Sequence, residues 1–124
     1  MQEHARDMKR AKKSGDGERD VIAKIAEMGP KDRAFAERIH ALVREHAPHL
    51  QPRTWYGMPA YTRDGKNVVF FQPAEKFKAR YATLGFDEGA KLDQGTFWPT
   101  SWALTEITPE VEAEIIRLVK QAAS

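Results

Sequence analysis

Three large aromatic side chains lie close together between residues 55 and 61, where they flank a glycine and a proline. The segment reads Trp55, Tyr56, Gly57, Met58, Pro59, Ala60 and Tyr61. Small-molecule sites usually combine aromatic walls with a few placed polar groups. We therefore predict a ligand-binding surface formed by this segment, later aromatic residues and one arginine: Trp55, Tyr56, Met58, Tyr61, Arg80, Trp98 and Trp102. Arg80 would be the polar anchor, because a guanidinium binds a carboxylate or a phosphate through two hydrogen bonds.

The alternative interpretation of these aromatic residues is a filled core. Large aromatic side chains dominate ordinary protein interiors. In that case Arg80 would be a surface residue of a strand. The sequence leaves both interpretations, a core and an open cleft, in place.

Carboxylates on helices suggest a second chemistry, the binding of iron or another divalent metal. Such hard cations need several oxygen ligands on one surface. Glu110 and Glu114 are four residues apart on a predicted helix, with Glu106 nearby, and Glu37 and Glu45 lie on an earlier helix. The arginines that interrupt this negative charge are Arg38, Arg44 and Arg117. A solvated helix face with mixed charges is therefore the simpler interpretation.

Residues for nucleophilic or zinc chemistry show no catalytic pattern. The chain has no cysteine, which excludes disulfides, thiolate metal sites and a cysteine nucleophile. None of the histidines has a zinc-binding spacing; they are His4, His40, His46 and His49. Ser101 lacks the Gly-x-Ser-x-Gly context of a serine nucleophile. We expect a binding protein with no catalytic residues.

The composition is that of one domain. The 124 residues are 41% hydrophobic and 31% charged, which suits a single core beneath a charged surface. The formal net charge of +2 is too small to indicate a nucleic-acid partner. The sequence contains no apolar stretch that would span a membrane and begins without the apolar core of a signal peptide. We expect a cytoplasmic protein, monomeric or weakly dimeric, without nucleic-acid or membrane partners.

Residues 1–17 are predicted to form a flexible charged tail, and residues 18–124 a single domain. Gly15 and Gly17 near the end of this tail favour a flexible joint. The tail carries a basic cluster made of Arg6, Lys9, Arg10, Lys12 and Lys13. With the amphipathic helix expected at 18–28, it offers an alternative function as a module that docks on a partner or on a second copy.

Three helices are predicted from apolar residues at helical spacing. They cover residues 18–28, the segment that Pro30 opens and Ala47-Pro48 stops, and the segment after Thr108. Gly29-Pro30 separates the first two helices, and Ala47-Pro48 ends the second. Thr108 is a good N-cap for the third helix.

A hairpin is predicted in the middle of the chain. Residues 55–62 and 67–72 are rich in aromatic and β-branched side chains, and they flank the turn signal Asp64-Gly65. The apolar run at 68–71 indicates a strand that is covered on both faces.

Further elements are predicted after the hairpin. Alternation over 77–84 indicates a third strand that ends at Gly85. Residues 87–92 could form a short helix. Residues 96–104 are expected to form an edge strand or a bend, because Pro99 cannot donate a ladder hydrogen bond.

This order of elements predicts an α+β fold. Strands bracketed by helices favour an antiparallel sheet of about four to five strands packed against flanking N- and C-terminal helices. The aromatic residues exceed what one core layer can hold. We therefore expect the second face of the sheet to be covered by loops or to form a concave aromatic surface.

The chain resembles the YdhG-like domain family, a bacterial group mostly of unknown function. The resemblance rests on Tyr56-Gly57-Met58-Pro59-Ala60-Tyr61, on Val69-Phe70-Phe71, on Phe77-Lys78-Ala79-Arg80-Tyr81, and on residues 95–104 before Thr108-Pro109. It covers residues 20–122 and leaves out the charged extension. It implies a compact α+β domain with a frataxin-like shape. One branch of the family is associated with iron delivery for iron–sulfur cluster or haem assembly, so iron is the cofactor that the resemblance implies.

Overall fold

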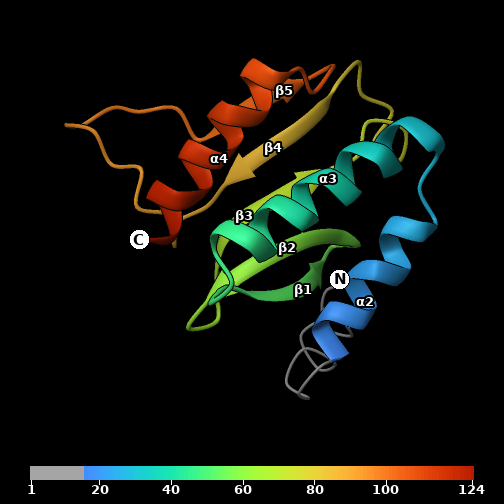
Figure 1. Ribbon diagram of the computed structural model, residues 1–124, viewed down its shortest axis with the longest axis horizontal. Helices are drawn as coiled ribbons and strands as arrows, with labels where there is room; N and C mark the ends of the chain where they lie inside the picture. Colours follow the sequence, from blue (N-terminus) through green and yellow to red (C-terminus); the bar gives the residue numbers. More distant parts are fainter. Residues whose placement is uncertain (1–15) are drawn as a thin grey trace.

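The computed structural model describes residues 16–124, which form one antiparallel sheet and three helices (Figure 1). The five strands lie in the sheet in the order β1-β2-β3-β4-β5, each antiparallel to its neighbour. The elements are α2 (Asp16–Ala26), α3 (Pro30–His46), β1 (Gln51–Trp55), β2 (Met58–Arg63), β3 (Lys66–Gln72), β4 (Ala82–Phe86), β5 (Ser101–Leu104) and α4 (Pro109–Ala123). This arrangement confirms the predicted α+β class. Within residues 16–124, no helix is long and apolar enough to cross a membrane.

Local signals place α3 and α4 as predicted. α3 begins at Pro30 after Gly29 and ends at His46, directly before Ala47-Pro48. The hydroxyl of Thr108 accepts a hydrogen bond from the amide of Val111 at 3.2 Å, which caps the first turn of α4. Both helices start with proline because the first helical position needs no amide donor.

α2 begins two residues earlier than predicted, at Asp16. Gly17 is therefore in its first turn and not in a flexible joint. A Cβ on Gly17 would lie 2.1 Å from the carbonyl oxygen of Pro52, so the glycine permits close contact between α2 and β1. α2 also buries Val21 and Ile25 in the core. The basic cluster and residues 1–15 of the predicted tail lie outside the described residues.

The predicted strand at 55–62 is wrong, because the chain reverses direction inside it. β1 ends at Trp55 and β2 starts at Met58, and Trp55 pairs with Met58 across a two-residue turn. Tyr56 and Gly57 have φ angles of 51° and 76°, as the type I′ turn of a tight hairpin requires. A tyrosine in the left-handed region is uncommon, so the residue types at 56 and 57 do not predict this turn. The predicted turn at Asp64-Gly65 is confirmed, with φ angles of 53° and 80°.

A bulge in β3 explains its run of apolar residues. Tyr61 pairs with Val69 and Thr62 pairs with Asn67, so Val68 is an extra residue in the ladder. Val68 and Val69 are both fully buried in the same core. The strand is thus not buried evenly on both faces, and Phe70 is half-buried on the other side.

The third strand predicted at 77–84 is present, but only residues 82–84 of that range belong to it. Residues 73–81 form a loop, β4 starts at Ala82, and Gly85 lies inside β4 instead of ending it. Residues 75–81 are exposed, so their alternating pattern does not reflect two faces of a sheet. Lys78 has a φ of 53°, which is incompatible with an extended strand.

The segment between β4 and β5 contains no helix at 87–92, contrary to the prediction. Its backbone bonds to β3 instead: the amide of Asp87 donates to Val68 O at 3.2 Å and the amide of Gly89 donates to Asn67 O at 3.0 Å. The predicted edge strand is confirmed in its last part, since β5 covers Ser101–Leu104 and lies at the end of the sheet.

The helices cover one face of the sheet. The strand residues of this face are Tyr61, Val69, Phe71, Leu84 and Phe86, and they share one core with buried residues of α2, α3 and α4. α3 crosses in front of β2 and β3, α4 lies over β4, and α2 runs near β1 (Figure 1). The register places the opposite set, Trp55, Met58, Ala60, Phe70 and Gly85, on the other face.

Candidate functional site

The structure places the predicted aromatic site residues in separate surroundings. Trp55 and Met58 are cross-strand partners on the face without helices, and the Trp55 ring meets Phe70 edge-on at 5.3 Å. Trp102 pairs with Leu84 on the helix-covered face and meets Phe86 edge-on at 5.5 Å. Trp55 and Trp102 therefore cannot line one cavity.

The other predicted site residues are also dispersed. Tyr61 is fully buried beneath α3, and Trp98 packs against the core from the loop before β5. Tyr56 is exposed in the β1–β2 turn, where its ring contacts Trp55 at 5.3 Å. Arg80 is exposed in the loop before β4, and its guanidinium lies 5.1 Å from the ring centre of Tyr81. Of the seven predicted residues, the structure brings Trp55 together with Tyr56 and with Met58.

Tyr61 belongs to a partly buried chain of hydrogen bonds that the sequence did not reveal. Its hydroxyl lies 2.8 Å from Nδ1 of His40, and Nε2 of His40 lies 3.1 Å from a carboxylate oxygen of Glu18. Arg44 pairs with the same carboxylate at 3.3 Å. A neutral His40 satisfies all partners if Tyr61 donates to Nδ1 and Nε2–H donates to Glu18. This series of hydrogen bonds joins α2, α3 and β2.

Burial shifts the pKa of the His40 imidazole and that of the Tyr61 hydroxyl in opposite directions. Burial lowers the pKa of His40 below its ordinary value, and the bond to Glu18 opposes that effect. Burial likewise raises the pKa of Tyr61 well above its ordinary value. Tyr61 is fully buried, so the three groups tie the helices to the sheet from the inside of the core outward.

One of the glutamates that suggested metal binding, Glu114, is engaged with Arg117, and this hydrogen bond lowers the pKa of its carboxyl group. Its neighbour Glu112 pairs with Arg38 in the same way. Among residues 16–124, no three His, Cys, Asp or Glu side chains are grouped to hold a metal ion. Iron binding has no structural support in this part of the chain.

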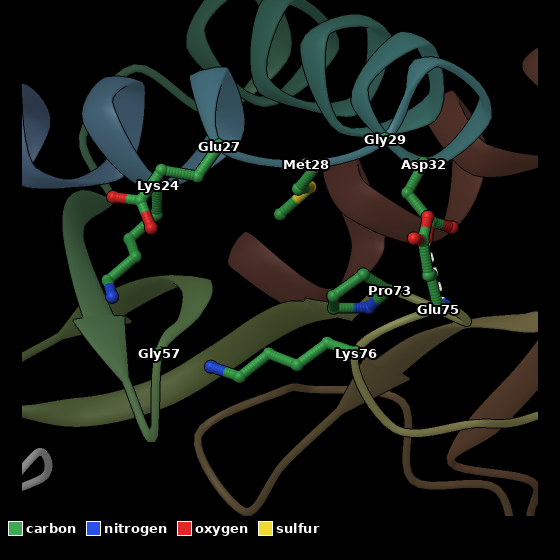
Figure 2. A pocket seen from close by; sticks show the side chains of 9 residues that line it. All are labelled: Lys24, Glu27, Met28, Gly29, Asp32, Gly57, Pro73, Glu75 and Lys76. Atoms are coloured by element: carbon green, nitrogen blue, oxygen red, sulfur yellow. Dashed lines mark hydrogen bonds between the residues drawn. The ribbon is translucent and has the colours of Figure 1, made fainter.

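A pocket of about 410 Å³ lies where four distant segments of the chain meet, and we call it the corner pocket. The segments are the end of α2, the start of α3, the β1–β2 turn and the loop after β3. The lining residues are Lys24, Glu27, Met28, Gly29, Asp32, Gly57, Pro73, Glu75 and Lys76 (Figure 2).

Both lysines of the corner pocket lie at one end together with Glu27, and two further carboxylates lie at the other end. Figure 2 shows the ammonium groups of Lys24 and Lys76 on the side next to Gly57, and the carboxylates of Asp32 and Glu75 on the far side. Met28 and Pro73 lie between the two ends (Figure 2).

Buried backbone contacts fix the acidic end. Asp32 is almost fully buried in the first turn of α3, and its two carboxylate oxygens accept hydrogen bonds from the amides of Ala74 and Glu75 at 3.1 and 3.0 Å. These bonds hold the loop after β3 against α3. Glu75 lies against the backbone at the start of α3, since a Cβ on Gly29 would be 2.4 Å from its Oε2. A carboxylate is favourable there because helix N-termini carry partial positive charge.

The β1–β2 turn fixes the basic end. Gly57 is buried with a positive φ and forms part of the pocket wall. The ammonium group of Lys76 lies 3.4 Å from the carbonyl oxygen of Tyr56, which directs this side chain toward the turn. Lys24 reaches the same end from α2 (Figure 2).

A second pocket, of about 320 Å³, lies on the other side of the same loop and contains Arg80 and Lys31. It shares Asp32 and Glu75 with the corner pocket. Arg80 lines this second pocket, but none of the predicted tryptophans lines it, so the role of Arg80 as a polar anchor stays a prediction.

Sequence reasoning missed the corner pocket because its residues are scattered from 24 to 76. Gly29 and Gly57 lie in its wall, but a glycine in a sequence signals a local turn or helix end and not which distant segments meet. A comparison with protein-family models, curated proteins and solved structures finds no match to the chain. The resemblance to the YdhG-like family, and the iron role that it implies, therefore stay predictions.

Proposed function

We propose that this chain is a binding protein that holds a small ligand in the corner pocket. The supporting observation is the pocket itself, whose volume of about 410 Å³ falls in the usual range for ligand sites of about 300–1,000 Å³. Its lining is more polar than that of most ligand sites, because five of the nine lining residues are charged and Met28 and Pro73 supply the apolar surface.

The chemistry of the lining favours binding over catalysis. None of the residues lining this pocket carries a hydroxyl, thiol or imidazole side chain, so it lacks the common nucleophile–base pairs. One of its carboxylates, Asp32, is occupied by two backbone amides. The fixed loop and turn provide a pre-formed wall, which reduces the entropy lost when a ligand binds.

The test is a screen of small metabolites against the full chain. The readouts are the backbone amide shifts of Gly29 and Gly57 and the fluorescence of Trp55, which adjoins the β1–β2 turn. We expect at least one compound to shift both glycine amides in a saturable way. Replacing Met28 with Gln should weaken the binding of that compound. The same replacement of Ile22, an exposed residue of α2, should leave its binding unchanged.

Two outcomes would contradict the proposal. In one, no compound of a broad set shifts Gly29 or Gly57. In the other, saturable binding occurs but moves residues outside the corner pocket and is insensitive to Met28.

A further inference from the structure

We propose that the ligand of the corner pocket has one anionic group, a carboxylate or a phosphate, bound between Lys24 and Lys76, and an uncharged or cationic end that faces Glu75. This inference rests on the proposed function and specifies the class of ligand. It follows from the arrangement of charges along the pocket.

The anionic group belongs at the end next to Gly57. Two ammonium groups from different elements, α2 and the loop after β3, lie on this side (Figure 2). An anion between two ammonium groups gains charge-assisted hydrogen bonds from both. Glu27 also lines the pocket, and its carboxylate lies on the same side as Lys24 (Figure 2). Its negative charge opposes the binding of an anion at this end.

The opposite end repels a second anion. Glu75 is exposed there, beside the buried carboxylate of Asp32. Asp32 is occupied by two amides, so Glu75 is the acidic group that a ligand would meet. An uncharged end is tolerated at this position, and an ammonium group would gain from it.

The middle of the pocket suits a short apolar body. Met28 and Pro73 provide apolar surface between the charged ends (Figure 2). Methionine adapts its shape readily, which permits some variation in the ligand body. The predicted class is therefore an apolar monoanion or a zwitterion, and not a dianion with charges at both ends.

Probes of matched length separate these classes. Hexanoate is the monoanion, ω-aminohexanoate the zwitterion, adipate the dianion and hexanamide the neutral control; hexyl phosphate replaces the carboxylate by a phosphate. Affinities are measured from the shifts of Gly29 and Gly57 in the full chain at constant ionic strength. We expect hexanoate and ω-aminohexanoate to bind at least about tenfold more tightly than hexanamide, which is the effect of one charged hydrogen bond.

Variants assign the charges to individual residues. Lys24→Gln and Lys76→Gln should each lower the affinity for hexanoate by about tenfold. Neither should lower the affinity for hexanamide. Glu27→Gln should raise the affinity for hexanoate. Glu75→Gln should bring adipate to the affinity of hexanoate. The charge-matched controls are the single variants Lys91→Gln and Lys120→Gln, whose lysines are exposed elsewhere on the protein. Each should leave all affinities unchanged.

The outcomes distinguish this inference from the proposed function. Equal binding of hexanamide and hexanoate, or hexanoate binding that survives both lysine substitutions, would overturn the anion assignment while leaving a ligand in the pocket. Adipate binding as tightly as hexanoate would overturn the assignment of the end near Glu75. If no probe and no screened metabolite binds to the folded protein, the proposed function fails as well. The relative affinity of hexyl phosphate decides between a phosphate and a carboxylate.

Discussion

Gly85 in β4 leaves the space that the ring of Phe70 occupies. A Cβ on Gly85 would lie 2.2 Å from Cζ of Phe70, far inside van der Waals contact. The two residues are cross-strand partners, and Phe70 in turn supports Trp55 edge-on. Covering a glycine with an aromatic ring restores the packing that a strand glycine lacks. This contact therefore organises the face of the sheet without helices.

The substitution Gly85→Ala should show opposite signs in two backgrounds. In the natural chain we expect it to lower the free energy of unfolding by about 1–3 kcal/mol, because the methyl group displaces Phe70. In a Phe70→Ala background it should raise that free energy by about 0.5–1 kcal/mol, because alanine suits a strand better than glycine. Urea unfolding of the four proteins measures both values. Additive effects would show that the two residues do not interact.

At the scale of elements, α2 both packs against the core and contributes a residue to the corner pocket. Its Val21 and Ile25 enter the core, and its Glu18 reaches His40 of α3. The same helix supplies Lys24 to the corner pocket. The position of α2 therefore depends on a hydrogen-bond chain that is complete when His40 is neutral.

The docking of α2 gives stability a dependence on pH. The pKa of His40 is lower in the folded protein than its ordinary value, whereas the unfolded chain should titrate near about 6.5. As pH falls below about 6.5, the unfolded chain binds a proton that the folded chain resists, so the free energy of unfolding decreases. The loss continues until pH passes the folded pKa, with a slope of no more than about 1.4 kcal/mol per pH unit.

The measurement is urea unfolding at several values between about pH 5 and 7.5 for the natural chain, His40→Gln and His46→Gln. His40→Gln should be less stable at the upper end, and its stability should change less with pH. His46→Gln should keep the slope of the natural chain. Equal slopes in the natural chain and His40→Gln would refute a role for His40.

At the scale of the whole molecule, the two edges of the sheet differ. β1 packs beside α2, with Gly17 in contact with Pro52. β5 has four residues, and three of them are exposed or half-exposed. β2 and β3 are central and hold the most fully buried side chains, Tyr61, Val69 and Phe71 among them.

Hydrogen exchange should follow this asymmetry. We expect the amides of β2 and β3 to exchange most slowly, through global unfolding, and those of β5 to exchange faster, through local opening. Exchange followed by mass spectrometry or by NMR tests the order. Protection of β5 equal to that of β3 would mean that the sheet opens as one unit.

Prediction from the sequence succeeded where a signal acts on its own neighbours. Thr108 and Pro109 start a helix, Pro48 follows the end of one, and Asp64-Gly65 forms a turn, because each depends on a few adjacent backbone groups. Prediction failed where distant residues decide. Tyr56 adopts a left-handed turn because β1 and β2 pair around it, and Gly85 is inside a strand because Phe70 fills its place.

The sequence by itself determined the α+β class, the three helices and one hairpin turn, because these follow from the local spacing of apolar residues and from turn and cap chemistry. Tertiary structure alone decided which face each aromatic residue occupies, since one turn residue or one bulge reverses the alternation of side chains. It also decided the candidate site. Lys24 and Lys76 come to one end of a pocket, and Asp32 and Glu75 to the other, because helix docking and strand pairing bring together segments that no local spacing connects.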